Sequence, residues 1–152
     1  MGSGVRLQER AVATLTLFAD TSVWSLAMRR DQPADDAAVR RLMHALESGE
    51  RVVTTGLVLQ ELLQGFYGPK AQEQIVDRLS ALPLVVPDRE DHIAAAALRN
   101  LCRKKGVQVA TIDALLAQLC IRHGLVLLTT DEDFTHIARH SELRLWEGTS
   151  SP

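Results

Sequence analysis

The stretch TLTLFAD, residues 14–20, decides the fold that we predict for this chain. It is rich in residues that favour β-strands, and it ends on Asp20. Thr21 and Ser22 follow directly, and residues of these types commonly begin helices. We therefore predict a buried strand that leads into a helix, with an acidic side chain at the point where the strand ends.

Two later segments repeat this arrangement. RVVTT (51–55) precedes GLVLQELLQGF (56–66), an apolar stretch that suits a mostly buried helix. LVLLTT (125–130) is a continuous apolar strand, and DEDF (131–134) follows it with a turn and a short helix. The pattern predicts three buried strands, each followed by polar residues and a helix.

The remaining segments continue the alternation of strands and helices. LPLVVP (82–87) predicts a third strand between prolines, and LRLW (143–146) predicts a final edge strand. Strands separated by helices pair in parallel through right-handed crossovers, so we predict an α/β fold with an open parallel sheet and helices on both faces. Further helices are expected at 37–48, 69–79, 88–105 and 112–123, the last of them capped by Thr111.

Length and composition indicate one domain. The chain has 152 residues, of which 46% are hydrophobic. We expect the domain to cover 14–147, with 1–13 as a flexible N-terminal extension or cloning remnant and 148–152 as a flexible tail. No apolar stretch reaches the roughly 18 residues needed to span a bilayer, and a signal peptide is absent, which predicts a cytoplasmic protein without membrane contact.

The net charge and the cysteines limit the function classes. A formal net charge of -2 does not favour a broad nucleic-acid-binding surface, so a polyanion would have to be received locally. Cys102 and Cys120 have neither metal-ligand nor disulfide spacing and are expected to be buried, inert thiols. The sequence has no Gly-rich phosphate loop, no Ser-His-Asp order and no Cys-His pairing, which disfavours nucleophilic mechanisms.

Acidic residues are predicted to meet at one edge of the sheet. Asp20 follows the first strand and Asp131 follows the fourth, and ligands of such sheets bind outside the carboxyl ends of the strands. Glu61 shares a helix face with Leu57 and Val58 and is therefore expected to face the core. An ionised carboxylate there needs a metal, an arginine or a proton, and both the metal and an arginine ion pair remain open for Glu61.

Asp113 lies in the first turn of its predicted helix, where negative charge is favourable. Taken singly, Asp113 and Asp20 have a simpler interpretation as helix-capping residues. Four segments that bring acids to one edge favour a common site instead. Asp131 is the first choice for the fourth acid and Asp133 the second, and the other one is expected to cap the short helix. Such oxygen ligands suit Mg²⁺ or Mn²⁺, which can activate a water for phosphodiester hydrolysis.

Other polar residues have simpler interpretations. The five histidines show no paired-ligand motif, so none is assigned to a metal. Trp24 is expected in the core or at an interface. Several cations are expected to be solvated helix-end charges, with phosphate contacts as the alternative: Arg29, Arg30, Arg40, Arg41, Arg103, Lys104 and Lys105.

Taken together, four segments over about residues 16–146 resemble the PIN domain, and within it the VapC-type toxins of toxin-antitoxin pairs. These segments are FADTSVW, TTGLVLQELLQG, TIDALLAQLC and LLTTDEDFTHIA. The resemblance implies a five-stranded parallel sheet, a Mg²⁺ or Mn²⁺ site, endoribonuclease activity, a homodimer and inhibition by a VapB-type antitoxin. It also implies the site residues: Asp20, Glu61, Asp113 and one of Asp131 and Asp133, with Ser22 and Thr130 as small polar neighbours.

The resulting hypothesis is metal-dependent hydrolysis of RNA by water, with transfer or ribosomal RNA as the targets typical of related toxins. One alternative is a non-catalytic module whose acidic pocket docks a basic partner segment, and another is a nuclease that cuts DNA. A receiver-like phosphoacceptor is disfavoured because it needs a second acid after the first strand and a late lysine. Here Thr21 follows Asp20, and no lysine follows Lys105.

Overall fold

Four short strands form a parallel sheet in the computed structural model, which describes residues 15–29 and 35–148. In spatial order they are β2 (Val52–Val53), β1 (Leu17–Ala19), β3 (Val126–Leu128) and β4 (Arg144–Leu145). The predicted α/β fold with a parallel sheet is confirmed. The predicted N-terminal extension, residues 149–152 of the predicted tail and Arg30 lie outside the described residues.

The sheet has four strands among the described residues, whereas five were expected. The segment expected to form the third strand is reduced to one parallel bridge between Thr54 and Leu84. Two hydrogen bonds hold it there: the Thr54 N–H donates to the Pro83 carbonyl (3.0 Å), and the Val85 N–H donates to the Thr54 carbonyl (2.7 Å). Proline has no N–H to donate to a ladder, so Pro83 and Pro87 limit this pairing to one residue pair.

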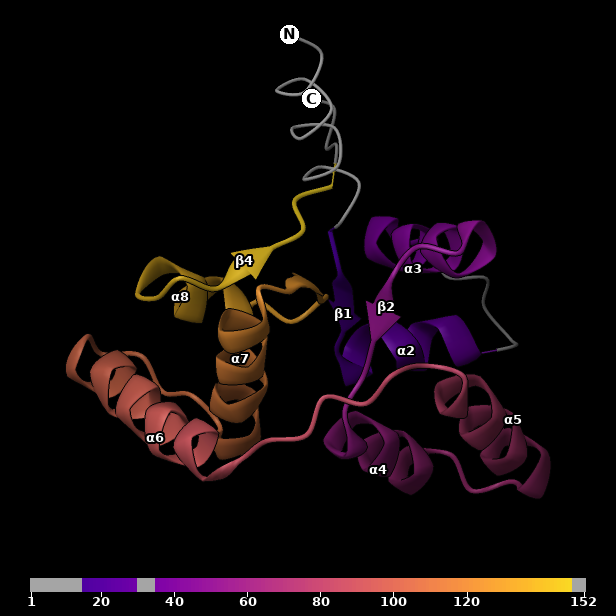
Figure 1. Cartoon of the computed structure of the whole chain (residues 1–152), viewed down its shortest axis with the longest axis horizontal. Helices are drawn as coiled ribbons and strands as arrows, with labels where there is room; N and C mark the ends of the chain where they lie inside the picture. The colour runs from indigo at the N-terminus through magenta and orange to yellow at the C-terminus, as the bar shows by residue number, and fades with distance from the viewer. Residues whose placement is uncertain (1–14, 30–34, 149–152) are drawn as a thin grey trace, which may run out of the picture.

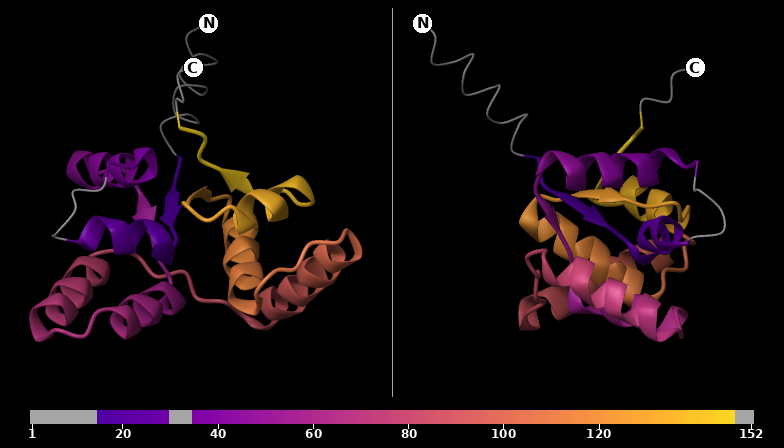
Figure 2. Two further views of the ribbon diagram at one scale, coloured as in Figure 1. Left: turned by 180° about the vertical axis from the view of Figure 1, so that it is seen from behind. Right: turned by 90° about the vertical axis from the view of Figure 1, so that its right-hand side faces the viewer.

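The helices form two groups on either side of β1 (Figure 1). In the first group, α2 packs against both α3 and α4, and α4 packs against α5. In the second group, α7 packs against α6 and α8. The same separation is visible from behind (Figure 2). This separation of the helices follows from right-handed crossovers. Connections that step along the sheet toward β2 place their helices on one face, and connections that step toward β4 place theirs on the other face. The helices are α2 (Thr21–Met28), α3 (Ala37–Ser48), α4 (Gly56–Gly65), α5 (Pro69–Ser80), α6 (Arg89–Lys104), α7 (Thr111–His123) and α8 (Asp133–Arg139).

The ends of α3 and α7 follow the expected chemistry, whereas the start of α7 does not. Gly49 and Gly124 end α3 and α7 in the left-handed conformation, at φ 72° and φ 62°. Thr111 was expected to cap α7, but it is the first helical residue, and Ala110 holds the capping position without a side-chain hydrogen bond. The prediction for Thr111 is wrong by one position.

The core surrounds β1 and β3, whose residues are all buried. Trp24 is fully buried, so its expected core position is confirmed. Cys102 and Cys120 are buried and unbonded, as predicted, and burial raises the pKa of both thiols, which keeps them protonated. Within the described residues, no helix is long and apolar enough to cross a membrane.

Candidate metal centre

The candidate site lies at the carboxyl ends of β1 and β3, which pair in parallel with Ala19 opposite Leu128. This register places the next residues, Asp20 and Thr129, beside each other. Thr129 Oγ1 donates a hydrogen bond to Asp20 Oδ2 (2.5 Å), and Ser22 Oγ donates one to Asp20 Oδ1 (2.6 Å). The connection that follows β1 steps toward β2, whereas the connection that follows β3 steps toward β4. The site between these two strand ends therefore occupies the switch point where α/β sheets bind ligands.

Asp20 is only 4% exposed. It also caps α2, because its Oδ1 accepts the Val23 N–H (3.2 Å), so the simpler capping role considered from the sequence is real. Burial raises the pKa of Asp20 above its ordinary value, and the negative charge of Asp131 acts in the same direction. The hydrogen bonds from Ser22, Thr129 and Val23 oppose this rise without cancelling it. Asp20 is therefore a buried acid whose two oxygens are held in fixed positions.

Three further acids meet beside Asp20. One carboxylate oxygen from each of Asp113, Asp131 and Asp133 lies within 4.8 Å of the other two. Asp113 comes from the first turn of α7, Asp131 comes from the turn between β3 and α8, and Asp133 is the first residue of α8. Among residues 15–29 and 35–148, no Lys, Arg or His nitrogen lies within 4.0 Å of these carboxylates. No cationic side chain of the described residues therefore balances the negative charge of this cluster.

The pKa of Asp113 is raised by its burial and by the acids around it. It is raised from 3.8 to about 6, first by burial and then by the negative charges of Asp131, Asp133, Glu61 and Asp20. All the acids chosen from the sequence thus act on one carboxyl group. A divalent cation would relieve this repulsion, and a set of carboxylate oxygens is the ligand set that Mg²⁺ and Mn²⁺ prefer. The residues present fit such an ion.

Glu61 reaches the site from α4 and is partly buried. Thr21 Oγ1 donates a hydrogen bond to Glu61 Oε1 (2.8 Å), which ties α4 to the start of α2. The alternative of a structural ion pair finds no support in the described part of the chain, because no arginine there lies within 4.0 Å of Glu61. Glu61 instead contributes its charge to the environment of Asp113.

Comparison with known proteins identifies the family. The PIN domain family matches residues 17–140. The chain belongs to the PIN domain family. Ribonuclease VapC11 of Mycobacterium tuberculosis is 32% identical over 130 residues, which cover 84% of this chain and 96% of that relative. This PIN domain is therefore of the VapC type, and the resemblance stated from the sequence is confirmed.

Solved structures share the fold of this PIN domain. VapBC2 from Rickettsia felis, bound to a DNA fragment from its promoter, has a TM-score of 0.68 at 19% identity, with 88% of this chain and 100% of that one covered. VapC20 from Mycobacterium tuberculosis, a sarcin-ricin loop cleaving toxin, has a TM-score of 0.60 at 23% identity, with 85% and 99% covered. At these identities the likeness establishes the architecture alone.

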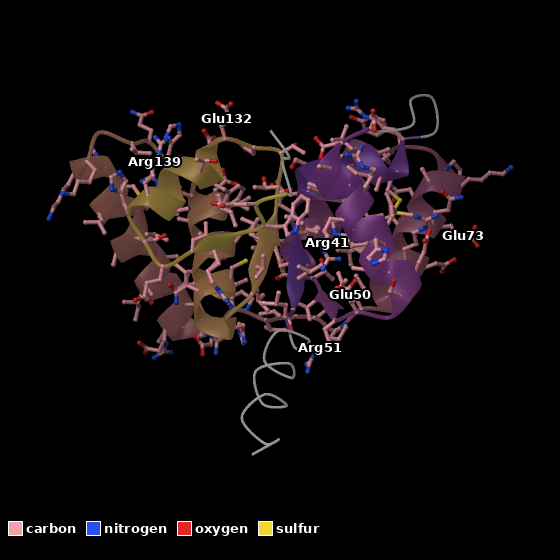
Figure 3. The ribbon with its side chains drawn as sticks, turned by 90° about the horizontal axis from the view of Figure 1, so that it is seen from above. Arg41, Glu50, Arg51, Glu73, Glu132 and Arg139 are labelled. Carbon is pink, nitrogen blue, oxygen red and sulfur yellow. The ribbon has the colours of Figure 1, made fainter. Side chains whose placement is uncertain are left out.

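Asp131 and Asp133 of this PIN domain play different local roles. Asp131 Oδ1 accepts the Asp133 N–H (2.9 Å), and Thr129 Oγ1 accepts the Asp131 N–H (2.9 Å). Whichever of these two acids is not the fourth ligand was expected to cap the short helix α8. Neither acid holds the capping position, which belongs to Glu132, although Asp131 accepts the N–H of the first helical residue, Asp133. That expectation is wrong. Glu132, between them, makes no side-chain capping bond and projects away from the ribbon (Figure 3).

Two threonines that contact the acids were not anticipated from the sequence. Ser22 and Thr130 were named as polar neighbours, and the Thr130 N–H does donate to Ser22 Oγ (3.1 Å), but Thr130 itself is exposed. The direct bonds to the acids come from Thr129 and Thr21. Thr129 becomes evident only from the register of β1 and β3, and Thr21 only from the packing of α2 on α4.

Two of the cations considered as phosphate contacts are engaged elsewhere. Arg41 forms two hydrogen bonds with Glu50 (3.0 and 2.7 Å), and both side chains are labelled on the same side of the molecule in Figure 3. Arg40 pairs with Asp35. Arg40 stays exposed and solvated, as expected, although it is paired. Arg41 is partly buried in its pair with Glu50, so it is neither the solvated charge nor the phosphate contact that was considered. The remaining cations of that set are exposed: Arg29, Arg103, Lys104 and Lys105.

Proposed function

We propose that this PIN domain is a Mg²⁺- or Mn²⁺-dependent endoribonuclease that acts as the toxin of a toxin-antitoxin pair. The observation that carries the proposal is the meeting of Asp113, Asp131 and Asp133 within 4.8 Å, with Glu61 and Asp20 close enough for their charges to raise the pKa of Asp113. Curated relatives named ribonucleases support the reaction class.

The residues that would hold the cation are Asp20, Glu61, Asp113, Asp131 and Asp133. When bound, a divalent cation lowers the pKa of an attacking water and neutralises charge on the leaving oxygen of a phosphodiester. The surrounding hydroxyls orient these ligands, since Ser22 and Thr129 fix Asp20, and Thr21 fixes Glu61. Such outer contacts matter because they hold the ligand oxygens in place before the cation arrives.

The substrate and partner belong to the same proposal. VapC20, which shares the fold, is a sarcin-ricin loop cleaving toxin, and this supports structured RNA of that kind as the substrate class. Transfer RNA is the second class that we propose. Several structures of the same fold are VapBC complexes, which supports a VapB-type antitoxin as the partner. We further propose a homodimer that works in the cytoplasm, where these RNAs are found.

Incubation with nucleic acid tests the reaction. The purified full-length protein is mixed with total RNA or with plasmid DNA, in Mg²⁺ or Mn²⁺ and then in excess chelator. We expect discrete RNA fragments with metal and none with chelator. RNA cutting that persists in chelator, or cutting of DNA alone, contradicts the proposal. Stable binding of a basic peptide without any cleavage supports the docking-module alternative instead.

Metal binding should stabilise the fold. A ligand that binds only the native state adds about 2.7 kcal/mol when its concentration is 100 times its Kd. For a chain of this length, we expect saturating Mn²⁺ to raise the Tm by about 5 °C or more. Thermal unfolding with and without Mn²⁺ measures this shift, and Glu61→Gln should reduce it. A Tm of the wild-type protein that does not change when Mn²⁺ is added would contradict a cation site at these acids.

The pKa of Asp113 predicts an unusual pH dependence for the metal-free protein. Its folded-state pKa of about 6 lies above the ordinary 3.8, so between these values the folded protein binds more protons than the unfolded chain. Metal-free stability should therefore decrease as pH rises from about 4 to about 6. Mn²⁺ competes with those protons, so its affinity should fall as pH drops below 6. Unfolding by urea across this pH range, in chelator, checks the sign.

A further inference from the structure

A pocket of about 250 Å³ opens between α6 and the first turns of α7. Its volume lies just below the range of roughly 300–1,000 Å³ that is usual for drug-sized ligands, so it suits a single flat ring system. The floor is apolar and the rim is polar. Among the lining residues, Ala95, Ala114 and Leu115 are buried and form part of the floor, whereas His92, Arg99 and Asn100 are exposed at the rim.

Arg99 is oriented by the backbone. Its Nε donates a hydrogen bond to the Val109 carbonyl (2.7 Å), which fixes the plane of the guanidinium group against the segment that leads into α7. Within the described residues, no carboxylate lies within 4.0 Å of this guanidinium group. Its two terminal amino groups therefore remain available to a ligand at the pocket rim. Asn100 adds an amide, which can both donate and accept hydrogen bonds.

The pocket adjoins the candidate metal centre through the start of α7. Thr111 and Ala114 line the pocket, and Asp113 of the acidic cluster lies between them in the sequence. The pocket and the cluster thus use different faces of the same helical turn, which is about 5.4 Å long. Thr111 and Ile112 are exposed, so an extended strand bound at the acids has open surface across which to reach the pocket.

We propose that this pocket binds an unpaired base of the RNA substrate, next to the bond that is cut. The inference rests on the proposed function and adds a substrate subsite to it. Single-stranded RNA is recognised by stacking splayed bases on aromatic rings or guanidinium planes and by hydrogen bonds to the base edges. Here the alanine floor receives the flat ring, the fixed guanidinium of Arg99 covers it, and Asn100 and His92 contact its edge.

Nucleotide binding tests the subsite without any need for cleavage. The full-length protein, labelled with ¹⁵N and ¹³C, is titrated in chelator with AMP, GMP, CMP and UMP, and the methyl signals of Ala95 and Ala114 are followed by NMR. We expect at least one nucleotide to shift both signals. Shifts confined to other parts of the protein, or shifts caused only by an apolar peptide, overturn the proposal. If nucleotides bind at this pocket but the protein cuts no RNA, the binding site is supported and the proposed nuclease activity is contradicted.

Two variants and one matched control test whether the pocket takes part in RNA binding. Arg99→Ala removes the stacking plane, and Ala96→Leu fills the pocket while leaving the polar rim in place. Arg103→Ala removes an exposed cation from the same helix outside the pocket. We expect the first two to weaken nucleotide binding at least about fivefold, and to raise KM and change the distribution of cut sites. The control should alter neither. Unchanged KM and cut sites in both pocket variants overturn the proposal.

Discussion

Replacing Asp113 with Asn is expected to reduce RNA cleavage at least about 100-fold while leaving the protein folded. Changes to residues that only support a metal ligand typically cost 10- to 100-fold, so the loss of a ligand itself should cost more. The position is decisive because burial, and then the negative charges of four nearby carboxylates, raise the pKa of Asp113 to about 6. Removing its charge therefore weakens the hold on the cation more than it disturbs the core.

Thermal unfolding distinguishes a folding defect from this loss of activity. In chelator at neutral pH, Asp113→Asn should raise the Tm by about 2 °C or more, because it removes charge repulsion from the metal-free site. Glu132→Gln is the matched control, since Glu132 is adjacent in sequence to Asp131 and Asp133 but projects away from the ribbon. It should leave cleavage unchanged. An Asp113→Asn protein that cuts RNA at the wild-type rate contradicts the assignment.

The largest expected effect on stability comes from Arg122→Met. Arg122 Nη2 lies 2.7 Å from Asp91 Oδ2, and the Asp91 side chain is 0% exposed. Removing one partner of a buried pair leaves an uncompensated charge, which typically costs 3–5 kcal/mol. Because the Arg122 side chain is 37% exposed, we expect a smaller loss of about 2–4 kcal/mol in the free energy of unfolding. Urea unfolding of the two proteins measures it.

Arg41→Met provides the comparison. Arg41 and Glu50 form a well-aligned pair, but both side chains are partly exposed, at 22% and 33%, so the expected loss is about 1 kcal/mol or less. Equal losses of stability for Arg122→Met and Arg41→Met would contradict this explanation.

The pH dependence of stability offers a second check on Asp91. Burial favours its neutral form, yet the Asp88 N–H and Arg122 hold its pKa below the ordinary value. Its stabilising contribution is thus present above pH 4 and is lost as pH falls further.

The acids of the site could be chosen from the sequence because each lies where strand and helix chemistry makes it conspicuous. Asp20 ends a buried strand, Asp113 opens a helix, and Glu61 faces the apolar side of its helix. Parallel pairing then brings strand ends together whatever the details of the register. This is why the edge of the sheet, and the acids that follow its strands, were predictable without coordinates.

The partners of those acids were not predictable in the same way. Thr129 bonds to Asp20 because Leu128 stands opposite Ala19, and a shift of one residue would turn its side chain to the other face. The pair of Asp91 and Arg122 joins two helices across 31 positions, and no local pattern marks such a contact. The Asp88 and Asp91 capping box, in contrast, has a spacing that could have been recognised.

The segment 82–87 shows where local composition misleads. Its valines and leucines favour a strand, and it does lie beside β2 in the expected parallel direction. Flanking prolines reduce it to a single bridge, since each removes a donor from the ladder. The hydrophobic pattern therefore predicted correctly that this segment pairs in parallel with the sheet, and it overestimated the length of the pairing.

The most direct measurement is the anomalous scattering of Mn²⁺ in crystals of the full-length protein. We expect one or two strong peaks bounded by Asp20, Glu61, Asp113 and the Asp131 and Asp133 pair, with metal-oxygen distances of about 2.0–2.3 Å. A crystal that contains Mn²⁺ but shows no peak there contradicts a metal site at these acids. So does a map in which Glu61 turns away from Asp113, or in which an arginine of the same chain fills the space between the carboxylates.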